Sequence, residues 1–213
     1  MVLRNVKMLE ALVVRHYSEP WRVYHDWQHI QRGLQYQYRI VEKTSFPNKS
    51  IDLSMLKMAW YLHDIVYIPG SPDNERLSSE LVPYFVNLTC GKVSDKFIDS
   101  VIAMVNATKK HELPTGLDSN AEVQCAILLD TDLAELGMPD QYERNKHLVK
   151  QEFCNVLGAR NILEFEKAWR KGRAEWIESM LNRQRIYHTD FAFLNWEESA
   201  RENLSSELAQ IRR

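Results

Sequence analysis

The side chains best suited to chemistry in this sequence are histidines and aspartates that stand next to apolar helical segments. Imidazole and carboxylate groups both bind divalent metals, and an ionisable group in an apolar context needs such a partner. One pair is spaced four residues apart, a second is a His-Asp dipeptide, and a third is an Asp-x-Asp stretch. These segments predict a metal site assembled from three parts of the chain. The candidate ligands are His25, His29, His63, Asp64, Asp130 and Asp132.

Each candidate also has an ordinary structural explanation. A His-Asp dipeptide alone carries little information, and His25-Asp26 is a second copy of it. A single histidine on an apolar face is more often a hydrogen-bonded core residue than a ligand. Asp130 and Asp132 could equally cap or terminate a helix. The ordered set is more informative than any member, because a helix with two histidines, a buried helix ending in His-Asp and a downstream aspartate follow one another.

Helical periodicity dominates the chain and is interrupted by clusters of proline, glycine and asparagine, not by the alternating pattern of strands. We therefore expect an all-α protein. Two pairs, Ser119 with Glu122 and Asp140 with Glu143, have the spacing of a capping box. Helices are expected over 1–20, 27–41, 51–67 with Ser50 as its cap, 75–88, 94–107, 119–129 and 141–158, and in two C-terminal segments ending near Asn182 and Arg213.

Longer stretches of the sequence resemble one known family. The order His, His-Asp, Asp is similar to that of the HD superfamily of metal-dependent phosphohydrolases. YHDWQHI, AWYLHDIVYIPGSPDNERLSSEL and LLDTDLAELG resemble a bacterial subgroup of that superfamily, and so do GRAEWIESMLNRQRIYHTD and ARENLSSEL near the C-terminus. The resemblance covers nearly the whole chain and implies an HD-domain helical bundle with additional C-terminal helices. It further implies a divalent metal ion bound by His29, His63, Asp64 and Asp132.

The resemblance also guides the choice between neighbouring candidates. The first ligand of the family is a His followed by an apolar residue and an Arg, which the HIQR stretch beginning at His29 fits better than His25 does. The last ligand stands just before a Leu, which favours Asp132 over Asp130, and Asp130 would then orient a ligand from behind. Such ligands suit Mn, Fe, Co, Ni, Zn and, less well, Mg, so the metal stays open. A second ion bridged by Asp64 is compatible with the pattern.

Further polar residues are candidates to act on a substrate. Asp64 is the expected catalytic metal ligand, and Glu75 could serve as general acid or base. A phosphate ester needs cationic or hydrogen-bonding groups to hold it, although each candidate could instead be a helix cap or an exposed charge. The candidates for substrate binding are His25, Asn74, Arg76, Thr108 and His111.

Other residues give weaker signals. Lys150, in the stretch VKQEF, stands where the subgroup prefers Arg, so a bidentate phosphate contact there is doubtful. Trp169 and Trp176 are expected to pack in the core. Tyr24, Tyr67 and Tyr187 could stack on a base.

Composition bounds the class of protein. The 213 residues carry a formal net charge of -2, with 45% hydrophobic and 26% charged residues, which suits one ordinary globular domain over 1–213 and argues against nucleic-acid binding. Within it we expect a metal-site core over about 20–135 and C-terminal helices over about 139–213. Three widely spaced cysteines favour a reducing cytoplasm. No apolar run approaches the length that crosses a bilayer, so no membrane association is expected.

These observations lead to a functional hypothesis. We expect a metal-dependent phosphohydrolase that uses an activated water to cleave a phosphate ester or anhydride of a nucleotide or related small phosphate. A cyclic-nucleotide phosphodiesterase is the nearest alternative. A non-catalytic sensor that binds metal or nucleotide is another, and a homodimer is compatible with the amphipathic C-terminal segments.

Overall fold

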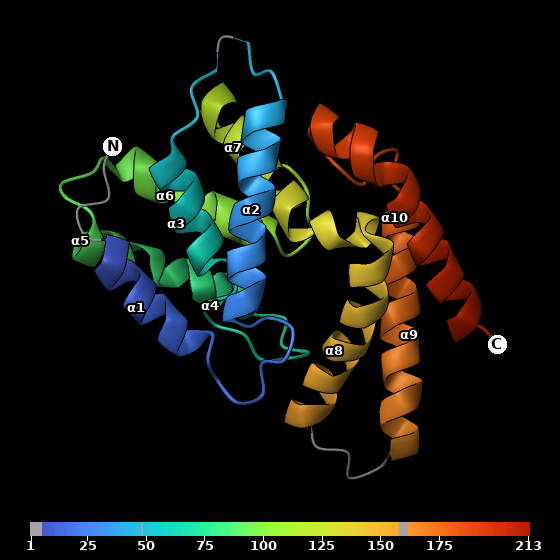
Figure 1. Ribbon diagram of the computed structural model, residues 1–213. Coiled ribbons are helices and arrows are strands. Elements are labelled where there is room, and N and C mark those ends of the chain that lie inside the picture. Colours follow the sequence, from blue (N-terminus) through green and yellow to red (C-terminus); the bar gives the residue numbers. More distant parts are fainter. Residues whose placement is uncertain (1–5, 48, 158–161) are drawn as a thin grey trace.

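The computed structural model describes residues 6–47, 49–157 and 162–213, which form helices and loops with no strand among them (Figure 1). The all-α prediction is therefore confirmed. The elements are α1 (Val6–His16), α2 (Trp27–Lys43), α3 (Leu53–Leu62), α4 (Asn74–Glu80), α5 (Val82–Thr89), α6 (Asp95–Ala107), α7 (Ser119–Asp132), the 3-10 helix η1 (Ala134–Gly137), α8 (Pro139–Leu157), α9 (Ile162–Leu181) and α10 (Asp190–Ile211).

The buried helix α3 is shorter than the sequence pattern predicts. Asp52, not Ser50, caps it, because the Asp52 carboxylate accepts hydrogen bonds from two backbone N–H groups of the first turn. The helix ends at Leu62, and His63 is its C-cap residue. The His-Asp pair therefore lies at the helix end, where its side chains can face other elements.

Three other helix boundaries differ from the expectation. The predicted helix over 75–88 is divided into α4 and α5, since Pro83 lacks an N–H group and stands in the first turn of α5. Asp118 rather than Ser119 caps α7, and this helix continues to Asp132. Helix α8 already begins at Pro139, so Asp140 lies inside its first turn and does not cap it.

Helices α2 and α3 approach each other closely at one glycine. A Cβ atom built on Gly33 would lie 1.9 Å from Cζ2 of Trp60, so only glycine allows this contact. The Trp60 indole N–H donates to the carbonyl oxygen of Ile30 at 2.9 Å, which fixes the ring against α2. Because Trp60 is fully buried, the two helices hold a rigid framework beside His29 and His63.

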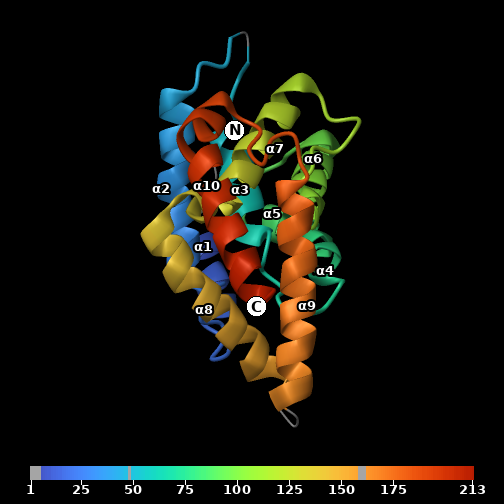
Figure 2. The same cartoon turned by 90° about the vertical axis from the view of Figure 1, so that its right-hand side faces the viewer.

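The C-terminal helices α8, α9 and α10 lie beside the body formed by α1 to α7 (Figures 1 and 2). Gly137 of η1 packs against the backbone of Trp196 in α10, where a Cβ would come within 2.7 Å of the Trp196 carbonyl oxygen. Helices α8 and α9 diverge from ends that lie close together, with α10 between them in this view (Figure 2). Among the described helices, none is both long and apolar enough to cross a membrane.

Candidate metal centre

Two helix ends bring the first pair of candidate ligands together. His29 lies in the first turn of α2, where its backbone N–H donates to the capping carboxylate of Asp26 at 2.9 Å. His63 follows the last residue of α3. Both imidazoles are buried, and the Trp60 indole stacks on His63 at a centroid distance of 4.3 Å and contacts His29 at 5.1 Å. Trp60 therefore sets the orientation of both rings.

The Nε2 atoms of these two histidines meet carboxylate oxygens without forming a hydrogen bond: for His63, Oδ2 of Asp64 is 3.2 Å away. Nδ1 of His63 lies 2.8 Å from the carbonyl oxygen of Trp60, so Nδ1 carries the hydrogen and a neutral His63 presents a free lone pair on Nε2. Within the described part of the chain, neither buried Nε2 atom has a hydrogen-bond partner. Buried polar atoms are rarely left unsatisfied, so these two atoms indicate a ligand.

Two carboxylates complete the cluster. Ligand atoms of His29, His63 and Asp64 all lie within 4.8 Å of one another. From the end of α7, Oδ1 of Asp132 lies 3.6 Å from Nε2 of His29 and 3.5 Å from Nε2 of His63. The structure thus brings together all four predicted metal ligands, from α2, the end of α3 and the end of α7.

The electrostatics of this cluster favour a positive charge at its centre. Burial disfavours the charged form of His63, but the carboxylates of Asp64 and Asp132 outweigh burial and raise the pKa of His63 well above its ordinary value. A bound proton and a bound cation are alternative ways to supply this charge. Two imidazoles and two carboxylates are a ligand set suited to a divalent transition metal.

No family model, curated protein or solved structure matches this chain. The residue geometry and the sequence resemblance are therefore the grounds on which a function can be argued.

His111 holds Asp132 in place through Oδ2, the carboxylate oxygen other than the one near His29 and His63. Nε2 of His111 lies 2.9 Å from Oδ2 of Asp132, which leaves Oδ1 turned toward the other two imidazoles. The backbone of His111 has a φ of 52°, a left-handed conformation that costs a non-glycine residue about 1 kcal/mol or more. Arg183 donates to its carbonyl oxygen at 2.8 Å, and so the segment before α10 stabilises this conformation.

His25 lies beside the cluster and has a partner that the sequence reasoning missed. It precedes α2, and its Nδ1 lies 2.5 Å from Oε2 of Glu152 in α8, whereas its Nε2 lies 3.9 Å from Oδ2 of Asp64. The ring of Tyr67 covers one face of His25 at a centroid distance of 4.0 Å. Burial lowers the pKa of His25, but the Glu152 carboxylate outweighs it and raises the pKa.

The other predicted substrate contacts form local interactions of their own. Asn74 is buried and bonds the backbone N–H and carbonyl of Ile68, so it shapes the loop before α4. Arg76 is exposed and forms ion pairs with Asp73 and Glu80. The Thr108 hydroxyl donates to a carbonyl at the end of α6. Asn74, Arg76 and Thr108 therefore have local structural partners, and their assignment to substrate binding stays a prediction.

Glu75 remains a candidate for proton transfer. It is half-buried, and burial together with the negative charge of nearby Asp64 raises the pKa of its carboxyl group. A carboxyl group with a raised pKa is a better proton donor near neutral pH than an ordinary glutamate.

Asp130 points away from the cluster. Its two oxygens accept hydrogen bonds from the backbone N–H groups of His188 and Thr189, both at 2.7 Å, and burial raises its pKa to about 7. It therefore orients no ligand directly, contrary to the expectation, but ties α7 to the start of α10. Lys150 pairs with Glu166 at 2.7 Å.

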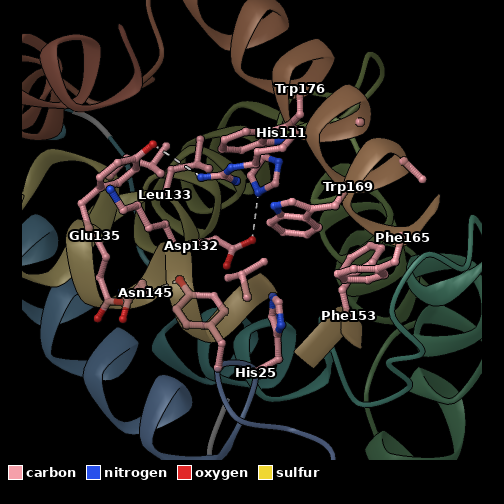
Figure 3. A pocket seen from close by; sticks show the side chains of 18 residues that line it. His25, His111, Asp132, Leu133, Glu135, Asn145, Phe153, Phe165, Trp169 and Trp176 are labelled. Atoms are coloured by element: carbon pink, nitrogen blue, oxygen red, sulfur yellow. Dashed lines mark hydrogen bonds and ion pairs between the residues drawn. The ribbon is translucent and has the colours of Figure 1, made fainter. Parts of the chain in front are cut away.

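A cavity of about 480 Å³ is lined by residues of α8 and α9 and by Asp132 of the cluster (Figure 3). His25, 3.9 Å from Asp64, and His111, 2.9 Å from Asp132, line it as well, and we call the part beside these three residues its inner end. Trp169 and Trp176 both line the cavity; Trp176 also packs against the hydrophobic core, as expected, whereas Trp169 is not part of that core. Tyr24 also lines the cavity, whereas Tyr187 is fully buried and donates to the carbonyl oxygen of Leu133, so Tyr187 has no free face for a base.

Proposed function

We propose that this protein is a metal-dependent phosphohydrolase whose divalent cation is held by His29, His63, Asp64 and Asp132. The proposal rests on the pair of buried Nε2 atoms of His29 and His63, which face two carboxylates and have no hydrogen-bond partner among the residues that the structure describes. The order of these residues in the sequence, which resembles the HD superfamily, agrees with this ligand set.

The chain's own residues have distinct parts in this proposal. A divalent cation, when bound, supplies positive charge to phosphoryl oxygens and makes water more acidic. His63 is held by the Trp60 carbonyl and Asp132 by His111, so both present one ligand atom to the centre. His25, fixed by Glu152, lies at the inner end of the cavity and can donate a hydrogen bond to a phosphoryl oxygen. Glu75 is the candidate proton donor to the leaving group.

The cavity next to the centre supports hydrolysis of a small molecule. Its volume lies in the range of typical small-molecule sites, and its inner end carries titratable groups. A large open nucleic-acid surface is not needed for such a substrate, in agreement with the formal net charge of -2.

The experiment is a phosphate-release screen over nucleotides, sugar phosphates and cyclic nucleotides with added Mn²⁺, Co²⁺, Ni²⁺ or Mg²⁺. We expect metal-dependent release by the wild-type protein and a loss of at least about 100-fold in the Asp64→Asn variant, since it removes a ligand charge without changing shape. Asp99→Asn, at an exposed position of α6, is the matched control and should keep full activity.

Different outcomes separate the alternatives. Opening of cyclic nucleotides alone would favour a cyclic-nucleotide phosphodiesterase. Stoichiometric metal and nucleotide binding without release from any compound would contradict the hydrolase and favour a sensor.

A further inference from the structure

The cavity beside the metal centre is built by two regularly spaced stripes of side chains. Both stripes have the spacing of one helix face, at three or four residues, so α8 and α9 present inward faces to a shared space. The α8 stripe consists of Tyr142, Asn145, Lys146, Val149 and Phe153, and the α9 stripe of Phe165, Ala168, Trp169, Gly172, Arg173 and Trp176.

Aromatic rings dominate the outer part of this cavity. Phe153 and Trp169 meet edge to face at a centroid distance of 5.2 Å, and Phe165 lies on the same side of the pocket (Figure 3). The guanidinium of Arg173 lies 4.5 Å from the ring centroid of Trp176. Such a wall offers flat π-faces and apolar area, which suit a planar aromatic group more than a sugar or an aliphatic chain.

The cations that line the cavity are already neutralised. Arg173 forms two parallel hydrogen bonds to Glu207, at 2.9 and 3.0 Å, and Lys146 pairs with Glu143 at 2.6 Å. Among the described residues, the cavity therefore carries no lysine or arginine without a carboxylate partner. A chain of two or three phosphates needs several unpaired cations. The lining instead suits one phosphate, placed at the inner end of the cavity beside Asp132, His25 and His111.

One residue keeps the aromatic part of the cavity open. Gly172 lies in the middle of α9, and a Cβ atom built on it meets nothing within 4 Å. A larger side chain at this position would extend into free space without a backbone clash. Gly172 is therefore a place where the cavity can be filled while the helix and the distant metal ligands stay intact.

We infer that the cavity between α8 and α9 binds the flat aromatic group of a phosphate monoester of nucleoside size, so that nucleoside monophosphates are the substrate class. This inference rests on the proposed phosphohydrolase function. The aromatic group lies against Trp169 and Phe153, and the single phosphate lies at the centre. A nucleoside triphosphate carries three phosphates where the cavity suits one, and a sugar phosphate has no aromatic group for the outer part of the cavity.

The test compares adenosine monophosphate, adenosine triphosphate and glycerol phosphate as substrates. We expect the highest kcat/KM for adenosine monophosphate. Gly172→Leu should lower the ratio of kcat/KM for adenosine monophosphate to that for glycerol phosphate about tenfold, because it fills the aromatic subsite. Lys171→Leu, which adds the same side chain at the neighbouring exposed position of α9, is the control and should leave the ratio unchanged.

Binding of adenosine, measured by calorimetry without metal, tests the cavity apart from turnover. We expect binding that Gly172→Leu weakens and that Asp64→Asn and Lys171→Leu preserve. If no phosphate ester is hydrolysed but this pattern is found, the hydrolase proposal fails and the aromatic subsite stands. Activity that is highest on the triphosphate or glycerol phosphate, or an unchanged ratio in Gly172→Leu, would overturn the substrate class. Absence of adenosine binding would overturn the subsite.

Discussion

Glu152 is a buried carboxylate that organises the loop carrying His25. Its Oε1 accepts hydrogen bonds from the backbone N–H groups of three consecutive residues, Val23, Tyr24 and His25, and its Oε2 bonds the His25 ring. Burial raises the pKa of Glu152, but His25 and these N–H groups outweigh it and lower the pKa. The carboxylate therefore stays charged and keeps His25 turned toward Asp64.

Glu152→Gln should lower kcat/KM about tenfold while the metal content stays at the wild-type level, because His25 loses its charged partner but no proposed ligand changes. Steady-state kinetics and metal analysis of the same preparation check this. Glu178→Gln, whose carboxylate pairs with Arg212 at the surface, is the control. Equal loss of metal and activity would show that Glu152 supports the fold of the centre rather than the position of His25.

The four candidate ligands could be predicted because their order along the chain, His, then His-Asp, then Asp, resembles that of a known family of metal-binding proteins. His63 and Asp64 follow an apolar helix, and Asp132 follows another. Glu152 could not be predicted in the same way, since it stands in an amphipathic helix among many charged residues and its partner His25 is 127 positions away. The stretch VKQEF drew attention to Lys150, which forms an ion pair with Glu166.

At the scale of helices, the contact between Gly33 and Trp60 sets the distance between α2 and α3. Gly33→Ala should lower the free energy of unfolding by about 1–3 kcal/mol, because the new methyl group overlaps the buried indole and forces the helices apart. It should also weaken metal binding, since Trp60 contacts both His29 and His63. Urea unfolding and a metal titration check both effects.

Gly172→Ala is the matched control for Gly33→Ala. It makes the same change in a helix but in open space, and it should stabilise the protein by about 0.5–1 kcal/mol. Equal effects of the two substitutions would contradict the close approach of α2 and α3.

The cap of α7 gives a prediction that depends on pH. Backbone N–H groups of the first turn and Lys96 lower the pKa of Asp118 to about 2 from its ordinary value of 3.8. Because the folded-state pKa is the lower one, the charged cap stabilises the fold above about pH 4, and this contribution is lost as pH falls toward 2. Asp118→Ala should lower the free energy of unfolding by about 1 kcal/mol at pH 7, and by less below pH 4.

Ser119→Ala is the control for the cap, since the sequence pattern placed the cap at Ser119. Urea unfolding of both variants between pH 3 and 7 decides between the positions. A larger effect of Ser119→Ala would contradict the assignment of Asp118.

Helix type and approximate position could be predicted from apolar periodicity, whereas several ends could not. Asp52 caps α3 instead of the nearby Ser50, and Asp118 caps α7 instead of the adjacent Ser119. The pattern alone cannot choose between neighbouring polar residues, because both can accept a backbone N–H bond. The break between α4 and α5 could have been predicted from Pro83, because a proline inside the stretch 75–88 interrupts a continuous helix.

At the scale of the whole molecule, the functional region lies between two groups of helices. The candidate ligands come from α2, α3 and α7, whereas the aromatic wall of the cavity comes from α8 and α9. The sequence predicted both Trp169 and Trp176 as core residues, but only Trp176 packs against the core, because an inward apolar stripe has the same spacing whether it meets another helix or a cavity. Only the divergence of α8 and α9 distinguishes the two cases (Figure 2).

The charge of the centre links metal binding to the stability of the whole chain. A cation that binds the folded state alone stabilises it by about 2.7 kcal/mol at a free concentration 100 times its Kd. We therefore expect Mn²⁺ or Co²⁺ to raise the melting temperature of the wild-type protein and EDTA to reverse the rise. Asp132→Asn should remove most of this shift, since it takes away one of the two carboxylate charges at the centre.

Metal analysis of purified wild-type and Asp132→Asn protein after loading with Mn²⁺ or Co²⁺ tests the central claim most directly. Asp140→Asn, at an exposed position in the first turn of α8, is the control. We expect at least one equivalent of metal in the wild type and the control, and a large loss in Asp132→Asn. No bound metal in the wild type under any loading condition, or equal metal in all three proteins, would contradict the proposed metal site.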